Sequence, residues 1–289
     1  MTGRDDLGAG RILVGTDGSE RAAVAVAQGA RIASCTGSQL DLLFVIDPGR
    51  PYEGEVEEEA LQVLADTAEL ARGFGVEATT SVVAGEPAHV LVQEAAEHEV
   101  ELICVGADAG LLDRPLKIGK VATHVVQEAS SSVLVARPVP EGFPARIVCG
   151  VDGSDASTNT ASIAAQLAVA SGAELRILHV IPVFRGKGEE WTVDPAVDEI
   201  PEELTGSVEI ARAAGVEPLL EMAMGRPESA LVKVAERDGA DLLVIGHRGI
   251  SGMTRMLLGS VSAHVTSHAR CSVFVVRPED AGTIDGDDG

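Results

Sequence analysis

The residues with the clearest chemical potential lie in a glycine-bearing loop in the last quarter of the chain. An apolar segment, Leu242–Ile245, is short enough to form a strand buried on both faces. Gly246 and Gly249 follow it, and an amphipathic segment that predicts a helix begins at Gly259 and Ser260. Backbone N–H groups and the positive end of a helix dipole meet at such a junction. The sequence therefore predicts an anion site, and specifically a phosphate site, in this loop.

The distribution of charge supports the same prediction. The chain has 45 Asp and Glu against 22 Lys and Arg, and its formal net charge is −23. From Leu242 to Pro278, however, there is no acidic residue. Arg248 and Arg255 lie within the loop, where they could screen phosphates, although loop arginines are more often simply solvated. An acidic protein that keeps one loop free of negative charge satisfies a requirement of phosphate binding.

The spacing of this loop, G-x2-G-x9-G-S, resembles the ATP-binding signature of the universal stress protein family. Four fixed positions between a strand and a helix are far more specific than a lone pair of glycines. The spacing fits neither a P-loop nor a G-x-G-x-x-G dinucleotide loop. The resemblance covers essentially Gly10–Pro278.

The resemblance implies an adenine nucleotide, ATP or AMP, with Mg²⁺ held by its phosphates and no metal ligand from the protein. It places Asp152 beside adenine and ribose, and the backbone of Val180 against adenine. Asp152 could instead, or in addition, form an Asx-turn before a helix capped by Ser154. Val180 could equally be an ordinary strand valine. The expected main site comprises Val151, Asp152, Val180, Gly246, Gly249, Gly259, Ser260 and Val261.

The elements that position these residues occur twice. Arg11–Ser19 (RILVGTDGS) resembles Arg146–Ser154 (RIVCGVDGS), and Val133–Pro138 resembles Val273–Pro278. A period near 140 residues indicates a duplicated domain and not a solenoid. The boundary falls in a Pro- and Gly-bearing linker, Arg137–Ala145. We expect domains at residues 1–140 and 141–278, followed by an acidic disordered tail at residues 279–289.

Each copy alternates strands with helices, which predicts an α/β fold with a parallel sheet. By resemblance, each is a flavodoxin- or Rossmann-like unit of five parallel strands in the order 3-2-1-4-5, with helices on both faces. Ligands of such sheets bind where the winding reverses, between strands one and four. In the second copy this rule brings the Asp152 loop and the Gly246 loop together. Expected strands are Ile12–Gly15, Leu40–Ile46, Ala78–Val83, Leu102–Gly106, Val133–Ala136, Ile147–Val151, Glu174–Val180, Glu217–Ala223, Leu242–Gly246 and Ser272–Val276. Expected helices in the first copy are Glu20–Ser34, Glu55–Arg72, Pro87–His98 and Lys117–Glu128.

The first copy departs from the signature at two of its four positions. Counting back 140 residues gives Gly106, Ala109, Gly119 and Lys120, so an alanine replaces a glycine and a lysine replaces the serine. Acidic residues also lie within this first loop. We therefore expect one tight nucleotide site, in the second half. A site formed by Asp17, Gly106, Gly119 and Lys120 is expected to be weak or absent, unless Lys120 restores phosphate binding as a point charge.

Composition argues against several other functions. The negative charge and the 2% aromatic content disfavour binding to nucleic acid or to anionic membranes. No apolar run approaches eighteen residues, and we expect a cytoplasmic protein with buried, free cysteines. His264 and His268 are spaced like a metal pair but equally suit the C-terminus of a helix, and no third ligand is placed. No catalytic constellation is recognisable.

Two functions remain open at this point. The favoured one is an ATP-binding regulatory module of a stress response, and the alternative is a weak ATPase or autophosphorylating enzyme of the adenine-nucleotide α-hydrolase-like superfamily. A purely structural dimer would not explain the acid-free loop. The resemblance implies that units pair through their fifth strands, and exposed apolar edge strands are hazardous, so the equivalent apolar segments Val133–Ala136 and Val273–Val276 are expected to pair with each other. The chain would then be an internal pseudo-dimer, and a homodimer of whole chains is also possible.

Overall fold

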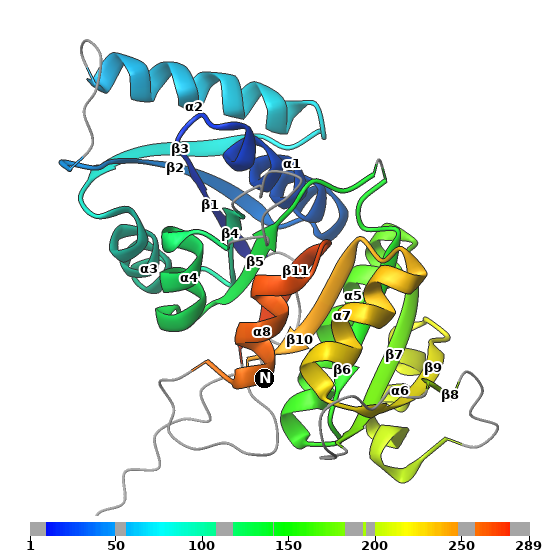
Figure 1. Cartoon of the computed structure of the whole chain (residues 1–289). Coiled ribbons are helices and arrows are strands. Elements are labelled where there is room, and N and C mark those ends of the chain that lie inside the picture. Colours follow the sequence, from blue (N-terminus) through cyan, green and yellow to red (C-terminus); the bar gives the residue numbers. More distant parts are fainter. Residues whose placement is uncertain are drawn as a thin grey trace, which may run out of the picture.

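The described part of the chain forms one continuous eleven-stranded sheet covered by helices on both faces (Figure 1). The computed structural model describes residues 10–49, 56–107, 118–140, 142–182, 193–194, 200–247 and 258–277. Within these ranges no helix is long and apolar enough to cross a membrane. The expected tail, residues 279–289, lies outside them.

The first half alternates strands and helices as expected. Its elements are β1 (Arg11–Thr16), α1 (Glu20–Thr36), β2 (Gln39–Ile46), α2 (Val56–Arg72), β3 (Ala78–Ala84), α3 (Pro87–Glu97), β4 (Leu102–Gly106), α4 (Lys120–Glu128) and β5 (Ser132–Ala136). Local chemistry fixes the helix starts, since Ser19 accepts from the N–H of Ala22 and Glu86 caps α3 ahead of Pro87. Helix α4 begins at Lys120, later than predicted, and the expected start at Lys117 lies outside the described residues.

The second half repeats this order with one addition. Its elements are β6 (Arg146–Val151), α5 (Asp155–Ser171), β7 (Glu174–Pro182), β8 (Val193–Asp194), α6 (Glu202–Ala214), β9 (Leu219–Gly225), α7 (Pro227–Asp238), β10 (Leu242–Gly246), α8 (Ser260–His268) and β11 (Ser272–Val276). The short strand β8 was not predicted, and it pairs antiparallel with β9 at the edge of the sheet. Strand β9 is shifted two residues towards the C-terminus of its predicted range, Glu217–Ala223.

The order of strands confirms the predicted winding in both halves. The sheet runs β3-β2-β1-β4-β5-β11-β10-β6-β7-β9-β8, so each half shows the order 3-2-1-4-5, with β8 added outside β9 in the second half. One apolar layer packs α1, α2, α5 and α6 against the sheet, and the other packs α3, α4, α7 and α8. Burial of the alternating strand side chains in these two layers supplies the main driving force for folding.

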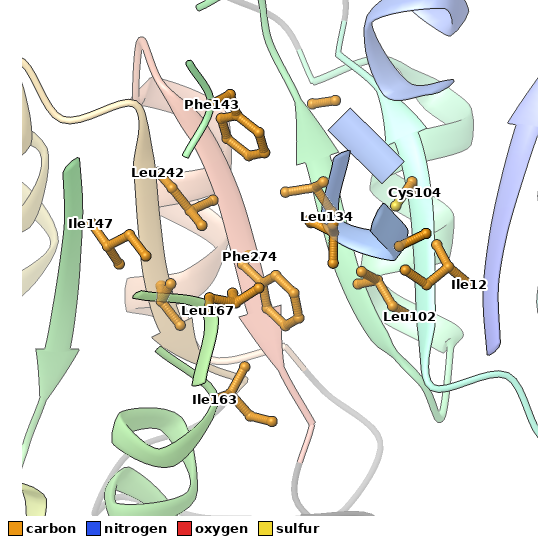
Figure 2. Packing of buried hydrophobic residues seen from close by; sticks show 14 of the residues in the cluster. Ile12, Leu102, Cys104, Leu134, Phe143, Ile147, Ile163, Leu167, Leu242 and Phe274 are labelled. Atoms are coloured by element: carbon orange, nitrogen blue, oxygen red, sulfur yellow. The ribbon is translucent and has the colours of Figure 1, made fainter. Parts of the chain in front are cut away.

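The two halves join through β5 and β11, as predicted. These strands pair antiparallel, and Leu134 lies opposite Phe274 at the centre of the register. The two residues are 140 positions apart and thus equivalent in the duplicated units, so a pseudo-twofold axis passes between them. Figure 2 shows both in the apolar layer, with Ile163 and Leu167 of α5 beside Phe274. Leu134 and Phe274 are fully buried.

This antiparallel junction determines where the two crevices lie. Within each half, β1 and β6 run parallel to their sheet neighbours, but the two sets of strands run in opposite directions. Consequently, the strands of the first half and those of the second half point in opposite directions, and their carboxyl ends lie at opposite ends of the sheet along the strand direction.

Candidate functional site

The candidate site in the second half is built where β6 and β10 end side by side. These strands are parallel neighbours, with Gly150 opposite Ile245. The loop that follows β6 at Asp152 therefore starts next to the loop that follows β10 at Gly246, as the winding rule predicted. Gly249, together with Arg248 and Arg255, lies outside the described residues.

Asp152 forms the predicted Asx-turn. Its Oδ1 atom accepts hydrogen bonds from the backbone N–H of Ser154 at 3.1 Å and from the Ser154 hydroxyl at 2.6 Å. Ser154 occupies the N-cap position of α5, but its side chain makes no capping bond. The Asx-turn holds the carboxylate at the carboxyl end of β6, which is the position from which it could reach a ligand.

Val151 and Val180 lie near the carboxyl ends of β6 and β7. Both side chains are buried, Val151 in the layer that contains α5 and Val180 in the opposite layer. Val180 lies one residue beyond the last paired position of β7 and β6, His179 opposite Val151. His179 was not predicted as part of the site; its Nδ1 lies 3.1 Å from the carbonyl oxygen of Val151 and can donate to it.

Helix α8 presents backbone N–H groups at the same edge. Gly259, its N-cap residue, donates its N–H to the carbonyl oxygen of His247 at 3.1 Å. Ser260 and Val261 form the start of the helix, whose first turn contains no acidic residue, and no side chain of the described residues caps it. Helices α1, α2, α6 and α7 each carry an acidic residue in their first turn, whereas α3 and α4, like α8, carry none. The positive end of the α8 dipole is thus available to an anion.

Ser262 secures this helix to the strand and was missed by sequence reasoning. Its buried hydroxyl donates to the carbonyl oxygen of Gly246 at 2.7 Å and lies 3.2 Å from that of His247. The bond links the first turn of α8 to the end of β10. Ser260 and Ser262 have the same side chain two residues apart, so sequence alone could not show which one faces inward.

The corresponding edge of the first half is arranged differently. A Cβ atom added at Gly106 would lie 2.4 Å from the carbonyl oxygen of Arg21, so packing alone requires glycine there. Gly119 has φ 84° and ψ 156°, whereas the equivalent Gly259 has φ −61° and ψ 148°. Asp17 is exposed and makes its own Asx-turn, accepting from Ser19 N–H at 3.0 Å. Lys120 is exposed at the start of α4, and Ala109 lies outside the described residues.

The two histidines spaced like a metal pair lie in the middle of α8 and at its C-terminal end. The rings of His264 and His268 stack with centroids 3.9 Å apart and an interplanar angle of 10°. His268 Nδ1 lies 2.8 Å from the carbonyl oxygen of His264, as expected for a histidine at a helix C-terminus. Burial and the neighbouring His268 lower the pKa of His264. No group of three or more potential metal ligands occurs within the residues that the structure describes.

Comparisons with known proteins agree with this architecture. The model of the universal stress protein family matches the chain twice, at residues 8–137 and 145–277. A universal stress protein of Mycolicibacterium smegmatis is 31% identical over 294 residues, covering 92% of this chain and 97% of that protein. One of Mycobacterium tuberculosis is 29% identical over 291 residues, covering 92% and 96%. The crystal structure of a universal stress protein from Archaeoglobus fulgidus shares the fold, with a TM-score of 0.72 at 20% identity over 92% of this chain and 98% of that chain.

Proposed function

The chain belongs to the universal stress protein family, and on this premise we propose that it binds one ATP molecule tightly, in its second half, as a nucleotide-dependent regulatory module. The observation that carries the proposal is the start of α8. There an acid-free first turn without a side-chain cap meets the carboxyl ends of β6 and β10. A helix start of this kind fits a phosphate group, because N–H donors and the helix dipole both favour negative charge.

Each expected residue has a role that its chemistry permits. The backbone N–H groups of Ser260 and Val261 and the Ser260 hydroxyl would donate to phosphate oxygens. Gly246, Gly249 and Gly259 lack side chains that would obstruct the phosphates. Mg²⁺ would be held by the phosphates and would neutralise part of their charge.

The other end of the nucleotide would lie over the ends of β6 and β7. The Asp152 carboxylate can accept a hydrogen bond from a ribose hydroxyl or from the exocyclic amine of adenine. Because the Val151 and Val180 side chains are buried, these residues would contact adenine through their backbones only. AMP would use this part of the site while occupying less of the phosphate loop.

We assign the tight site to residues 141–278 and a weak or absent one to residues 1–140. The positive φ of Gly119 and the exposed Lys120 give the start of α4 a different shape and chemistry from the start of α8. Asp17, Gly106, Gly119 and Lys120 would then form a degenerate copy of the site, in which Gly106 serves packing.

Two measurements test this proposal. Mass spectrometry of the small molecules released by heat denaturation of freshly purified protein should identify an adenine nucleotide. Calorimetric titration of nucleotide-free protein with ATP should give one tight site per chain, with AMP and cAMP titrated in parallel. Absence of binding would remove the proposed function, and two equally tight sites would show that the first half is not degenerate. Release of ADP during prolonged incubation would support the alternative of a weak ATPase.

A further inference from the structure

Arg137, the residue that follows β5, reaches out of the first half and contacts the C-terminal end of α8. Its side chain is only 2% exposed. The guanidinium Nη2 donates to the carbonyl oxygen of Thr266, and Nη1 donates to that of Cys271 at 3.3 Å. An arginine that sequence analysis assigns to a linker is therefore part of the junction between the halves.

Side chains of the second half extend this contact to the candidate phosphate loop. The Thr266 hydroxyl donates to the carbonyl oxygen of Ser262 at 2.8 Å and lies 3.1 Å from that of Ala263. The Ser262 hydroxyl in turn donates to the carbonyl oxygen of Gly246, where the loop begins. Thr266 and Ser262 are both almost completely buried. These contacts, called the polar path below, join Arg137 to the α8 backbone at Thr266 and join the first turn of α8 to the end of β10, while the Thr266 hydroxyl bond lies within the helix between them.

Hydrogen bonds from α1 and β11 also fix the position of Arg137. Gln28 of α1 donates its side-chain N–H to the carbonyl oxygen of Arg137 at 2.7 Å, and its Oε1 accepts from the Ser272 hydroxyl at 2.8 Å. The backbone N–H of Arg137 donates to Ser272 Oγ at 3.0 Å. The orientation of Arg137 therefore depends on α1 and β11 together, that is, on the docking of the two halves.

An equivalent arginine contact occurs in the first half, at α4, but the two hydroxyl groups of the polar path have no equivalent there. Arg277, equivalent to Arg137, donates to the carbonyl oxygens of Val126 at 2.7 Å and Gln127 at 3.1 Å, at the end of α4. Val126 and Ala122 occupy the positions of Thr266 and Ser262, and neither has a hydroxyl group. Of the two halves, only the one with the intact glycine signature has the polar path.

Arg137 and the proposed phosphate face opposite ends of the dipole of α8. Burial lowers the pKa of Arg137 to about 10, so the guanidinium remains charged at neutral pH. This cation faces carbonyl groups at the negative end of α8, and a phosphate at the start of α8 would face the positive end. Helix α8 has nine residues and is therefore roughly 13 Å long.

We infer that Arg137, Thr266 and Ser262 are positioning residues through which the first half sets the affinity of the nucleotide site in the second half. The inference rests on the proposed function. The Arg137 contact fixes the C-terminal end of α8 against the first half, the Ser262 bond fixes its first turn against β10, and the Thr266 bond supports the helix between these two contacts. The N–H groups of Ser260 and Val261 then point in a direction that the docked first half helps to determine.

The test compares variants of Thr266 in the full-length, nucleotide-free chain, titrated with ATP in the presence of Mg²⁺ well below their melting temperatures. Thr266→Val preserves shape but removes the hydroxyl, and should weaken binding by about 3- to 10-fold, the equivalent of one buried hydrogen bond. Thr266→Ser restores the hydroxyl and should bind within about twofold of the natural chain. Ser267→Ala is the matched control, because the Ser267 hydroxyl donates to Ala263 on the same helix but lies outside the path.

A second pair of variants tests the contribution of the first half. Arg137→Ala removes the contact without altering α8, and should weaken ATP binding at the remote site. Arg277→Ala removes the equivalent contact to α4 and should leave that affinity within about twofold. Equal affinity in Thr266→Val and the natural chain, or equal losses in Arg137→Ala and Arg277→Ala, would overturn the inference.

Hydrogen exchange separates this inference from the proposed function, because it requires no nucleotide. Two amides report on the first turn of α8: the Gly259 N–H donates to the carbonyl oxygen of His247, and the Ala263 N–H donates to that of Gly259. Their protection should fall in Thr266→Val and Arg137→Ala but not in Ser267→Ala. If the natural chain binds no ATP but protection falls as expected, the proposed function fails and the structural path stands. Unchanged protection in Thr266→Val refutes the path itself.

Discussion

Replacing the N-cap glycine of α8 or of α4 with aspartate should have opposite effects on stability and on nucleotide binding. Gly259 has φ −61° and ψ 148°, an extended conformation that aspartate adopts readily. Gly119 has φ 84° and ψ 156°, a region essentially restricted to glycine. The two residues are equivalent in the duplicated sequence, so each variant is the matched control of the other.

The magnitudes follow from these backbone angles. At Gly259, an aspartate cap adds a few tenths of a kcal/mol over glycine, and its charge at the helix start adds about 0.3–1 kcal/mol. The apo protein should therefore melt about 1–4 °C higher. At Gly119, backbone strain of about 1–3 kcal/mol outweighs the same gain, and the melting temperature should fall by about 2–6 °C.

Nucleotide binding should respond in the opposite sense. The carboxylate of Gly259→Asp lies where we propose the phosphates bind, and like charges in contact cost several kcal/mol, or about 100-fold or more in affinity. Gly119→Asp should leave the tight site unchanged. Thermal melts without nucleotide and calorimetric titration with ATP measure the two quantities separately. The reasoning is refuted if Gly259→Asp retains full affinity, or if Gly119→Asp is the variant that loses the tight site.

Three further predictions use other parts of the molecule. Ser260→Ala should weaken ATP binding by about 1.5–3 kcal/mol, or roughly 10- to 150-fold, without altering the apo melting temperature; unchanged affinity in calorimetry would remove Ser260 from the site. Glu221→Ala removes a buried carboxylate that bonds to two arginines and should lower the free energy of unfolding by about 1–3 kcal/mol in urea titration. Arg212→Ala, which breaks an exposed ion pair, should leave that value unchanged, and equal effects would contradict this distinction. In native protein, iodoacetamide should modify half-buried Cys35 before Cys149, because Cys149 is fully buried and burial raises its pKa to about 12. Peptide mass mapping that found Cys149 modified first would show that β6 opens readily.

Much of the fold was predictable because its determinants are local. Apolar runs marked the parallel strands, Ser19 marked the start of α1, and the repeat implied that the outer apolar strands of both copies would pair. Strand β8 could not be foreseen, since two residues carry no periodicity and its pairing with β9 depends on the tertiary fold.

The candidate site was predictable only in part. The glycine signature and the winding rule together placed the Asp152 and Gly246 loops side by side. Arg137 and Ser262 were missed because their partners are backbone carbonyl groups distant in the sequence. Every residue has a carbonyl group, so the sequence does not show which one will accept a hydrogen bond. Gly119 and Gly259 are the same residue in the same motif, yet only the surrounding structure gives them different backbone angles.

The pairing of β5 with β11 within one chain has a consequence for how the two copies can differ. Separate identical subunits carry every substitution at both sites, and they meet at a rate set by their concentration. Here the halves are tethered by the short segment between β5 and β6, which raises their effective mutual concentration to about the millimolar range. Their association therefore does not require both copies to keep the same sequence. One copy can lose its phosphate loop and keep its docking strand, and under the proposed function each molecule would then present a single defined arrangement of one complete and one altered site.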